Sequence, residues 1–89
     1  TGVGGATATA IGERLKQLSK YTQVLSITHS PQVAAKSDQH YLVQKEHLEH
    51  TTKTSVGLLT HQQRLEEIAR MLSGSTITEA SLSAAQDLL

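Results

Sequence analysis

The 89-residue sequence contains no cysteine, no phenylalanine and no tryptophan, and it has only two tyrosines. The absence of cysteine excludes disulfides, thiolate metal sites and a cysteine nucleophile. The scarcity of aromatic side chains argues against a base-stacking surface for nucleic acid and leaves Leu, Ile, Val and Ala to form the core. Eight basic residues balance eight acidic ones, so the basic excess of a typical DNA-binding patch is missing.

The sequence also lacks the patterns of membrane and secreted proteins. No apolar run approaches the roughly 18 residues of a membrane span, and the N-terminus lacks the basic-then-apolar pattern of a signal peptide. We therefore expect no membrane partner and a cytoplasmic protein. A chain of this length forms one small domain or part of one. Because its first residue is Thr rather than Met, we expect it to be processed or excised from a larger protein.

Hydrophobic periodicity predicts an α/β chain in the order helix, strand, short helix, strand, strand, helix, helix. The predicted helices cover residues 6–18, 31–36, 60–73 and 78–89, and the predicted strands cover 23–28, 40–45 and 54–60. The first strand is apolar enough for a sheet that is covered on both faces. Polar residues 46–53 connect the other two strands, which predicts an antiparallel hairpin, and Gly57 indicates a bulge within it.

Three helices carry apolar stripes that we expect to be buried. The stripes are Ile11, Leu15 and Leu18; then Leu65, Ile68, Ala69 and Leu72; and finally Leu82, Ala85 and Leu89. The charged residues Arg64, Glu66, Glu67 and Arg70 are predicted to form a solvated helix face. Thr60 with Gln63 predicts a capping box, and Gly74 predicts the end of that helix.

The junction between the first strand and the short helix is the leading candidate for chemistry. His29 directly follows the strand, Ser30 is a favourable N-cap, and Pro31 occupies the preferred first helical position. Ligands gather at the carboxyl ends of strands in open α/β sheets, and helix N-termini favour anions. His29 is therefore a candidate phosphate contact. The alternative is a histidine that only satisfies a strand-end carbonyl.

A glycine-rich entry precedes the first helix. Gly2, Gly4 and Gly5 permit a close backbone approach, but the segment matches neither the P-loop nor the dinucleotide-binding pattern. A glycine loop that opens a helix normally follows a strand, and no such strand precedes this one. A flexible entry is the alternative interpretation.

Other chemistry has weaker support. His40, His47, His50 and His61 could supply three zinc ligands, but they lie largely in a predicted solvated connector, so we expect no metal site. No G-x-S-x-G sequence occurs, and no catalytic triad is recognisable.

Four segments together resemble a known family. The segments are T-G-V-G-G-A at 1–6, I-T-H-S-P-Q-V-A at 27–34, D-Q-H-Y at 38–41 and R-L-E-E-I-A-R-M-L-S-G at 64–74. In this order they resemble the C-terminal end of the RecN family of bacterial DNA repair ATPases, in the SMC-like branch of the ABC-type ATPases. The resemblance spans nearly the whole chain, and T-H-x-P-Q-V-A is its most specific part.

The resemblance implies that residues 1–89 are the C-terminal lobe of a P-loop ATPase head, with a truncated sheet, flanking helices and a β-hairpin. Residues 28–32 would be the H-loop, in which His29 contacts the γ-phosphate as the switch histidine and Ser30 lies beside the nucleotide. The remnant of the D-loop, which would meet a second head across the nucleotide-sandwich homodimer, comprises Thr1, Gly2, Val3, Gly4 and Gly5.

The remaining ATPase motifs of the family would lie upstream. They are the Walker A loop, the signature motif and the Walker B Asp-Glu, whose strand would be the one missing before the glycine segment. ATP and Mg²⁺ would therefore bind the full-length parent, and this part alone would be inactive without a cofactor. The parent would be nucleoid-associated and would act in recombinational repair of DNA double-strand breaks. Only the full-length parent, and not this part of it, would contact DNA.

Two further expectations concern partners. An exposed sheet edge invites pairing with another chain, so we expect this part to self-associate. The alternative function is a free-standing α/β interaction module that binds no nucleotide and docks through the helices at 60–73 and 78–89.

Overall fold

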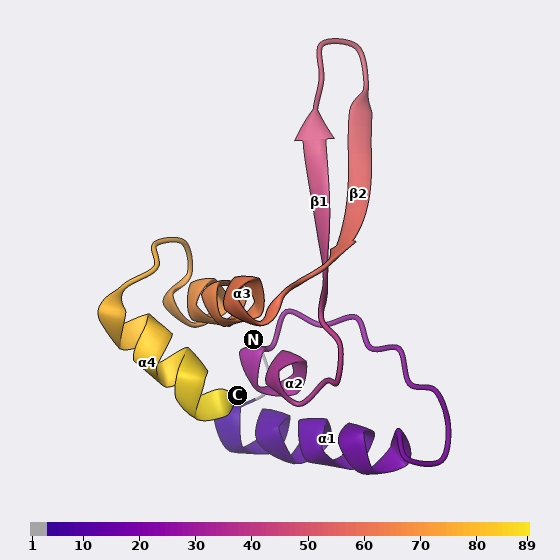
Figure 1. Ribbon diagram of the computed structural model, residues 1–89, viewed down its shortest axis with the longest axis vertical. Coiled ribbons are helices and arrows are strands. Elements are labelled where there is room, and N and C mark those ends of the chain that lie inside the picture. Colours follow the sequence, from indigo (N-terminus) through magenta and orange to yellow (C-terminus); the bar gives the residue numbers. More distant parts are fainter. Residues whose placement is uncertain (1–3) are drawn as a thin grey trace.

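The computed structural model describes residues 4–89, and it confirms the α/β class. Within that range the chain forms four helices and one two-stranded antiparallel sheet (Figure 1). Their bounds are α1 Gly5–Leu18, α2 Pro31–Ala35, β1 Tyr41–His47, β2 Thr52–Leu58, α3 His61–Ser73 and α4 Glu79–Leu88.

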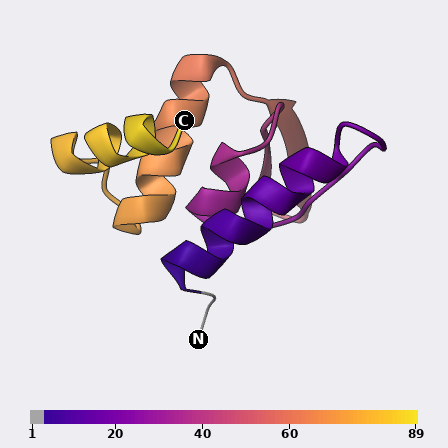
Figure 2. The same cartoon turned by 90° about the horizontal axis from the view of Figure 1, so that it is seen from below.

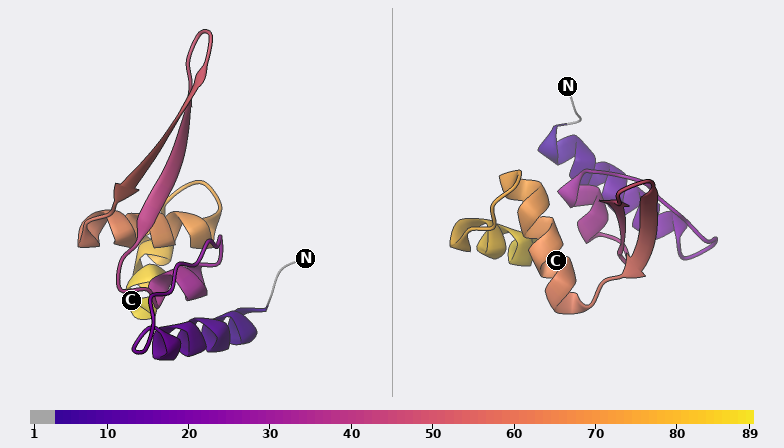
Figure 3. Two further views of the ribbon diagram at one scale, coloured as in Figure 1. Left: turned by 90° about the vertical axis from the view of Figure 1, so that its right-hand side faces the viewer. Right: turned by 90° about the horizontal axis from the view of Figure 1, so that it is seen from above.

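The helices lie beside one another in chain order. The short helix α2 contacts α1 on one side and α3 on the other, and α4 packs against the far side of α3 (Figure 2). The hairpin of β1 and β2 stands away from the helices as a projecting arm, which two perpendicular views show clearly (Figures 1 and 3). Helix α2 is therefore the central layer, and the segment that precedes it is positioned through it.

Local capping signals set the helix ends as the sequence predicts. Ser30 Oγ accepts a hydrogen bond from the Val33 amide at 3.4 Å at the start of α2. At the start of α3, the Thr60 amide donates to Gln63 Oε1 at 2.9 Å, and the Gln63 amide donates to Thr60 Oγ1 at 3.2 Å. Gly74 ends α3 with φ of 96°, a conformation that glycine adopts without steric cost. The predicted capping box and stop are confirmed.

The core lies mainly between α3, α4 and the C-terminal end of α2. Ile68, Ala69 and Ala85 are fully buried, and Leu65, Leu72 and Leu82 pack against them. The predicted stripe of α3 is therefore confirmed.

The stripe of α4 is only partly correct. Ala85 is buried and Leu82 packs against the core, whereas Leu89 remains 38% exposed.

Helix α1 buries a different face from the one that the sequence predicts. Of the predicted stripe, Ile11 and Leu18 are 42% and 50% exposed and Leu15 is half-buried, whereas Ala8 and Gly12 are buried. These two small residues lie four positions apart, and so they share one face of the helix. The correction has a steric reason, because small side chains let a neighbouring backbone approach closely and larger ones on the same face would not.

At Gly12 the backbones of α1 and α2 approach each other closely. A Cβ atom added at Gly12 would lie 3.2 Å from the carbonyl oxygen of Gln32 and 3.3 Å from Cα of Val33. Both neighbours are backbone atoms, which cannot rotate out of the way. The glycine therefore permits the contact between α1 and α2.

The strand predicted at residues 23–28 is wrong. Within residues 4–89 that segment lies outside any sheet, and Leu25 and Ile27 are 86% and 98% exposed. A strand requires a neighbour with which to exchange backbone hydrogen bonds, and β1 and β2 pair with each other. The apolar pattern predicts that this segment is buried, but no other element of residues 4–89 covers Leu25 and Ile27.

The predicted hairpin is confirmed, but its strands extend further toward the tip. Pairing runs without interruption from Tyr41 opposite Leu58 to His47 opposite Thr52. Gly57 stands directly opposite its partner in this ladder, so the predicted bulge is wrong. A glycine inside a strand only suggests a bulge, and here the two strands are equally long.

No helix in the part of the chain that the structure describes is both long and apolar enough to cross a membrane.

We expect Gly12→Ala to lower the free energy of unfolding by about 1 kcal/mol, and by no more than about 2 kcal/mol. Overpacking of this kind typically costs about 1–3 kcal/mol, which exceeds the gain of about 1 kcal/mol in helix propensity. Gly57→Ala is the matched control, because a Cβ there meets no atom of the described residues within 4 Å. Urea denaturation followed by circular dichroism measures both. Equal stability of the two variants would contradict the close approach of α1 and α2.

Candidate functional site

His29 lies at the end of the extended segment, immediately before α2, and it is exposed to solvent. The backbone around it is ordered by the Ser30 amide, which donates to Thr28 Oγ1 at 2.9 Å. Ser30 then caps α2, so the residues on both sides of His29 are tied to the start of that helix. These hydrogen bonds hold the backbone on both sides of His29, and the His29 side chain is exposed at the surface.

The Ser30 hydroxyl is already engaged within the chain. It accepts from the Val33 amide and donates to Gln32 Oε1 at 3.1 Å. Its capping role is therefore structural, whereas the neighbouring His29 remains available at the surface.

The glycine segment approaches the same region from α1. Thr1, Gly2 and Val3 lie outside the described residues, while Gly4 is the N-cap of α1 and Gly5 is its first residue. A Cβ atom at Gly5 would lie 3.7 Å from Nε2 of the Gln32 side chain. The structure therefore brings the described end of the glycine segment against the residues that follow His29.

Helix α2 is fixed on its other side by Arg64 of α3. The Nη2 atom of Arg64 lies 3.1 Å from the carbonyl oxygen of Ala34, 3.0 Å from that of Ala35 and 2.6 Å from that of Ser37. The last carbonyls of a helix have no partner within the helix, and a cation is favoured at this end of the helix dipole. Arg64 therefore satisfies the C-terminal end of α2 and attaches it to α3.

Arg64 was not identifiable as a functional residue from charge patterning, which predicts a solvated face for it. The correction follows from helix geometry, because Arg64 lies four residues before Ile68 and therefore beside the buried stripe. That spacing was the available signal. Exposure was also predicted for Glu66, Glu67 and Arg70. Arg70 is exposed and pairs with Glu67, whereas Glu66 and Glu67 are half-buried, so the predicted solvated face is only partly correct.

An ion pair fixes the chain just after α2. Lys16 Nζ of α1 donates to Asp38 Oδ1 at 2.8 Å. The hydrogen bond from Lys16 and its positive charge lower the pKa of the Asp38 carboxyl. Both groups are solvent-exposed, and so this contact contributes little to stability while defining the path of the chain.

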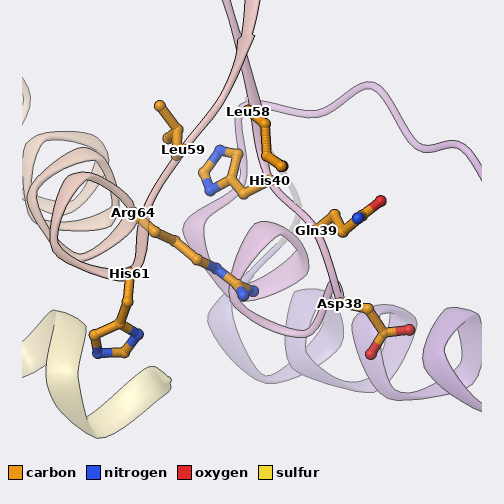
Figure 4. A pocket seen from close by; sticks show the side chains of 7 residues that line it. All are labelled: Asp38, Gln39, His40, Leu58, Leu59, His61 and Arg64. Carbon is orange, nitrogen blue, oxygen red and sulfur yellow. The ribbon is translucent and has the colours of Figure 1, made fainter.

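A hollow of about 250 Å³ lies between the base of the hairpin and the Arg64 side chain (Figure 4). Its lining residues are Asp38, Gln39, His40, Leu58, Leu59, His61 and Arg64. Burial lowers the pKa of the His40 imidazole, and the positive charge of Arg64 lowers it further. His61 points away from His40 and Arg64 in Figure 4.

The four histidines considered as zinc ligands are divided between two places. His40 and His61 line the hollow at the base of the hairpin, whereas His47 ends β1 and His50 lies in the turn at the tip. Among residues 4–89, no group of three histidine, cysteine or acidic side chains could hold a metal ion.

The amino-acid sequence of the chain is similar to that of known bacterial proteins. No family model matches the chain. It is 57% identical to a protein of Rickettsia felis over 88 residues, 50% identical to one of Deinococcus radiodurans over 88 residues, and 47% identical to one of Xylella fastidiosa over 89 residues. The three relatives are DNA repair proteins. Each is named DNA repair protein RecN, and the chain is homologous to a portion of that protein.

The homology covers the chain almost completely but the relatives only in part. The matched residues are 99–100% of this chain and 15–16% of the three relatives. The chain thus spans about one sixth of the length of the curated relatives that it matches. The resemblance to RecN is confirmed at this level.

We expect Arg64→Met to lower the free energy of unfolding by about 1.5–3 kcal/mol, the usual contribution of hydrogen bonds to a charged group. The methionine keeps much of the apolar stem but removes the donor to the carbonyls of Ala35 and Ser37, while the carbonyl of Ala34 still accepts from the Ser37 amide and hydroxyl. Arg70→Met is the control, because it removes a single i,i+3 ion pair whose Arg70 side chain is 46% exposed, and it should cost about 1 kcal/mol or less. Urea denaturation of both variants gives the comparison. A loss for Arg64→Met no larger than that for the control would show that the contact with α2 contributes nothing.

Proposed function

We propose that this chain is the C-terminal lobe of a RecN-type ATPase head that acts in recombinational repair of DNA double-strand breaks. In this proposal His29 is the switch histidine that contacts the γ-phosphate of ATP, and residues 1–5 belong to the D-loop that meets a second head. The full-length parent would bind ATP and Mg²⁺, form the homodimer in the cytoplasm and contact DNA. The chain alone would not hydrolyse ATP, because its sequence contains no Walker A loop.

One observation carries the proposal most directly. The described end of the glycine segment lies against Gln32, three residues after the exposed His29. A switch histidine and a dimer-interface loop must both face the nucleotide between two heads, and so they must lie near each other. The contact between Gly5 and Gln32 supports such a shared face, although 27 positions separate the two residues in the sequence.

The exposed segment 23–28 also supports a larger parent. Leu25 and Ile27 are exposed here, yet apolar strands of this kind are typical of sheets covered on both faces. In the proposed parent, an upstream strand would supply the missing pairing partner and hold His29 at the carboxyl end of a sheet.

In phosphoryl transfer the protein contributes mainly positioning and charge stabilisation. His29 would do both, by donating a hydrogen bond to a γ-phosphate oxygen from a backbone that Ser30 and α2 hold in place. In this chain the backbone beside His29 is held by hydrogen bonds, whereas the ring is exposed to solvent. Such an arrangement suits a residue whose side chain binds its partner only in the nucleotide-bound head.

The alternative, an interaction module that docks through α3 and α4, has less support. The apolar stripes of these helices are buried against each other, with Ile68, Ala69 and Ala85 at 0% exposure. The large hydrophobic side chain that is most exposed among the described residues, Ile27 at 98%, lies instead in segment 23–28.

We expect His29→Ala in the full-length parent to reduce ATP turnover by about 10²–10³-fold, the usual cost of removing one donor to a transition state. ATP-dependent head dimerisation should weaken in the same variant. Steady-state hydrolysis and light scattering with and without ATP measure the two effects.

His50→Ala is the matched control, since His50 lies exposed in the hairpin turn and should leave both properties unchanged. Normal turnover and normal ATP-dependent dimerisation in His29→Ala would overturn the assigned role.

We also expect the 89-residue chain to self-associate through segment 23–28. Ile27→Lys should reduce this association, because a charge on an unpaired extended segment opposes pairing with another chain. Thr51→Lys, in the hairpin turn, is the control. Sedimentation velocity over a range of concentrations tests the expectation, and a concentration-independent monomer for the unmodified chain would contradict it.

A further inference from the structure

Two buried nitrogen atoms in the wall of the hollow at the hairpin base are unsatisfied. Nδ1 of His40 and Nε of Arg64 have no hydrogen-bond partner among residues 4–89. The guanidinium Nε–H can only donate, whereas the imidazole Nδ1 can accept when the ring is neutral. A neutral His40 is therefore compatible with its place beside Arg64. A protonated ring would turn Nδ1 into a second buried donor and add a positive charge next to the guanidinium.

We propose that His40 and Arg64 form an acid-sensitive latch, in which protonation of His40 expels its ring from the hollow and loosens the hold of Arg64 on α2. The inference concerns a conformational property of the chain and is independent of the proposed nucleotide role of His29.

Hydrogen bonds connect the latch to two elements. The His40 carbonyl accepts from the Leu59 amide at 2.9 Å and so closes the base of the hairpin. Arg64 contacts the carbonyls at the C-terminal end of α2. Displacement of His40 therefore disturbs the base of the arm and the end of α2 together, and α2 begins directly after the segment that carries His29.

The charged groups around His40 determine the direction of the effect. From α3, Arg64 opposes protonation of His40 and Glu67 favours it, while burial opposes it most strongly. Asp38 and His61 line the same hollow, and the Asp38 carboxylate is already paired with Lys16.

The pKa of His40 is lower in the folded chain than the usual value of about 6.5. Open states therefore bind more protons than the latched state in the interval below 6.5. The stabilisation by the latch is complete above that pH and is lost as the pH falls toward the folded pKa.

Amide hydrogen exchange of the ¹⁵N-labelled chain tests the latch. The amides of Ala34 and Ser37, which donate to Ser30 and Ala34 carbonyls, report on α2. Their protection factors, corrected for intrinsic exchange rates, should fall between pH 7.5 and pH 5. For a single titrating group the fall is at most about tenfold per pH unit.

Two histidine variants separate the latch from general acid sensitivity. His40→Gln should abolish the pH dependence of α2 protection over this interval, because glutamine does not titrate. His61→Gln is the control, since His61 lines the same hollow but points away from Arg64 (Figure 4), and it should retain the wild-type pH dependence. Persistence of the pH dependence in His40→Gln overturns the proposal, as does its loss in His61→Gln.

If His40→Gln fails to fold, a measurement on the unmodified chain tests the same proposal. Long-range ¹H–¹⁵N spectra of the imidazole rings give the titration midpoint of His40. The proposal requires a midpoint below 6.5, with loss of α2 protection over the same pH range. A midpoint at or above 6.5, or protection that does not change with His40 titration, overturns it.

Discussion

The attachment of α2 to α3 through Arg64 is the interaction on which the arrangement of this chain depends. A helix of five residues is too short to be stable by itself, and the carbonyls at its end need donors from elsewhere. Arg64 supplies such a donor from a helix whose own position is fixed by the buried Ile68. Because His29 and Ser30 immediately precede α2, the place of the candidate site depends on a contact at the opposite end of that helix.

The chain builds this arrangement from small side chains. Most of its fully or nearly fully buried hydrophobic residues are alanines, and Ile68 is the largest of the completely buried side chains among those described. Alanine buries little apolar area, so such a core gains less from the hydrophobic effect than one with aromatic residues. The fold therefore depends more on other interactions. These are the close approach of two backbones at Gly12, the capping boxes of α3 and α4, and the hydrogen bonds from Arg64.

Features that depend on neighbouring residues in the sequence could be predicted, whereas features that depend on distant partners could not. The caps at Ser30 and Thr60, the stop at Gly74 and the hairpin all arise from local chemistry. The strand at residues 23–28 was wrong because a strand exists only when a partner lies beside it. The buried face of α1 was also wrong, because hydrophobicity favours Ile11 and Leu18, whereas the space available beside α2 admits only small residues.

The same distinction applies to the candidate site. The sequence placed His29 correctly before a capped helix, because both the cap and the proline at the helix start are local signals. It did not indicate that Gly5 and Gln32 meet, since that contact follows from the packing of α1 on α2. Nor did it separate Arg64 from the other charged residues of α3, because the acceptors of Arg64 lie outside α3, in α2 and just after it.

The pairing of the hairpin arm limits which insertions and deletions its strands can accept. Its two strands are paired residue by residue and stand away from the helices of residues 4–89 (Figure 3). One residue added to each strand would lengthen the arm by about 3.3 Å and exchange the faces of every side chain beyond the insertion. Two residues added to each strand would preserve the faces. Insertions and deletions in pairs of this kind would therefore change the reach of the arm while the base at Tyr41 and Leu58 stays in place.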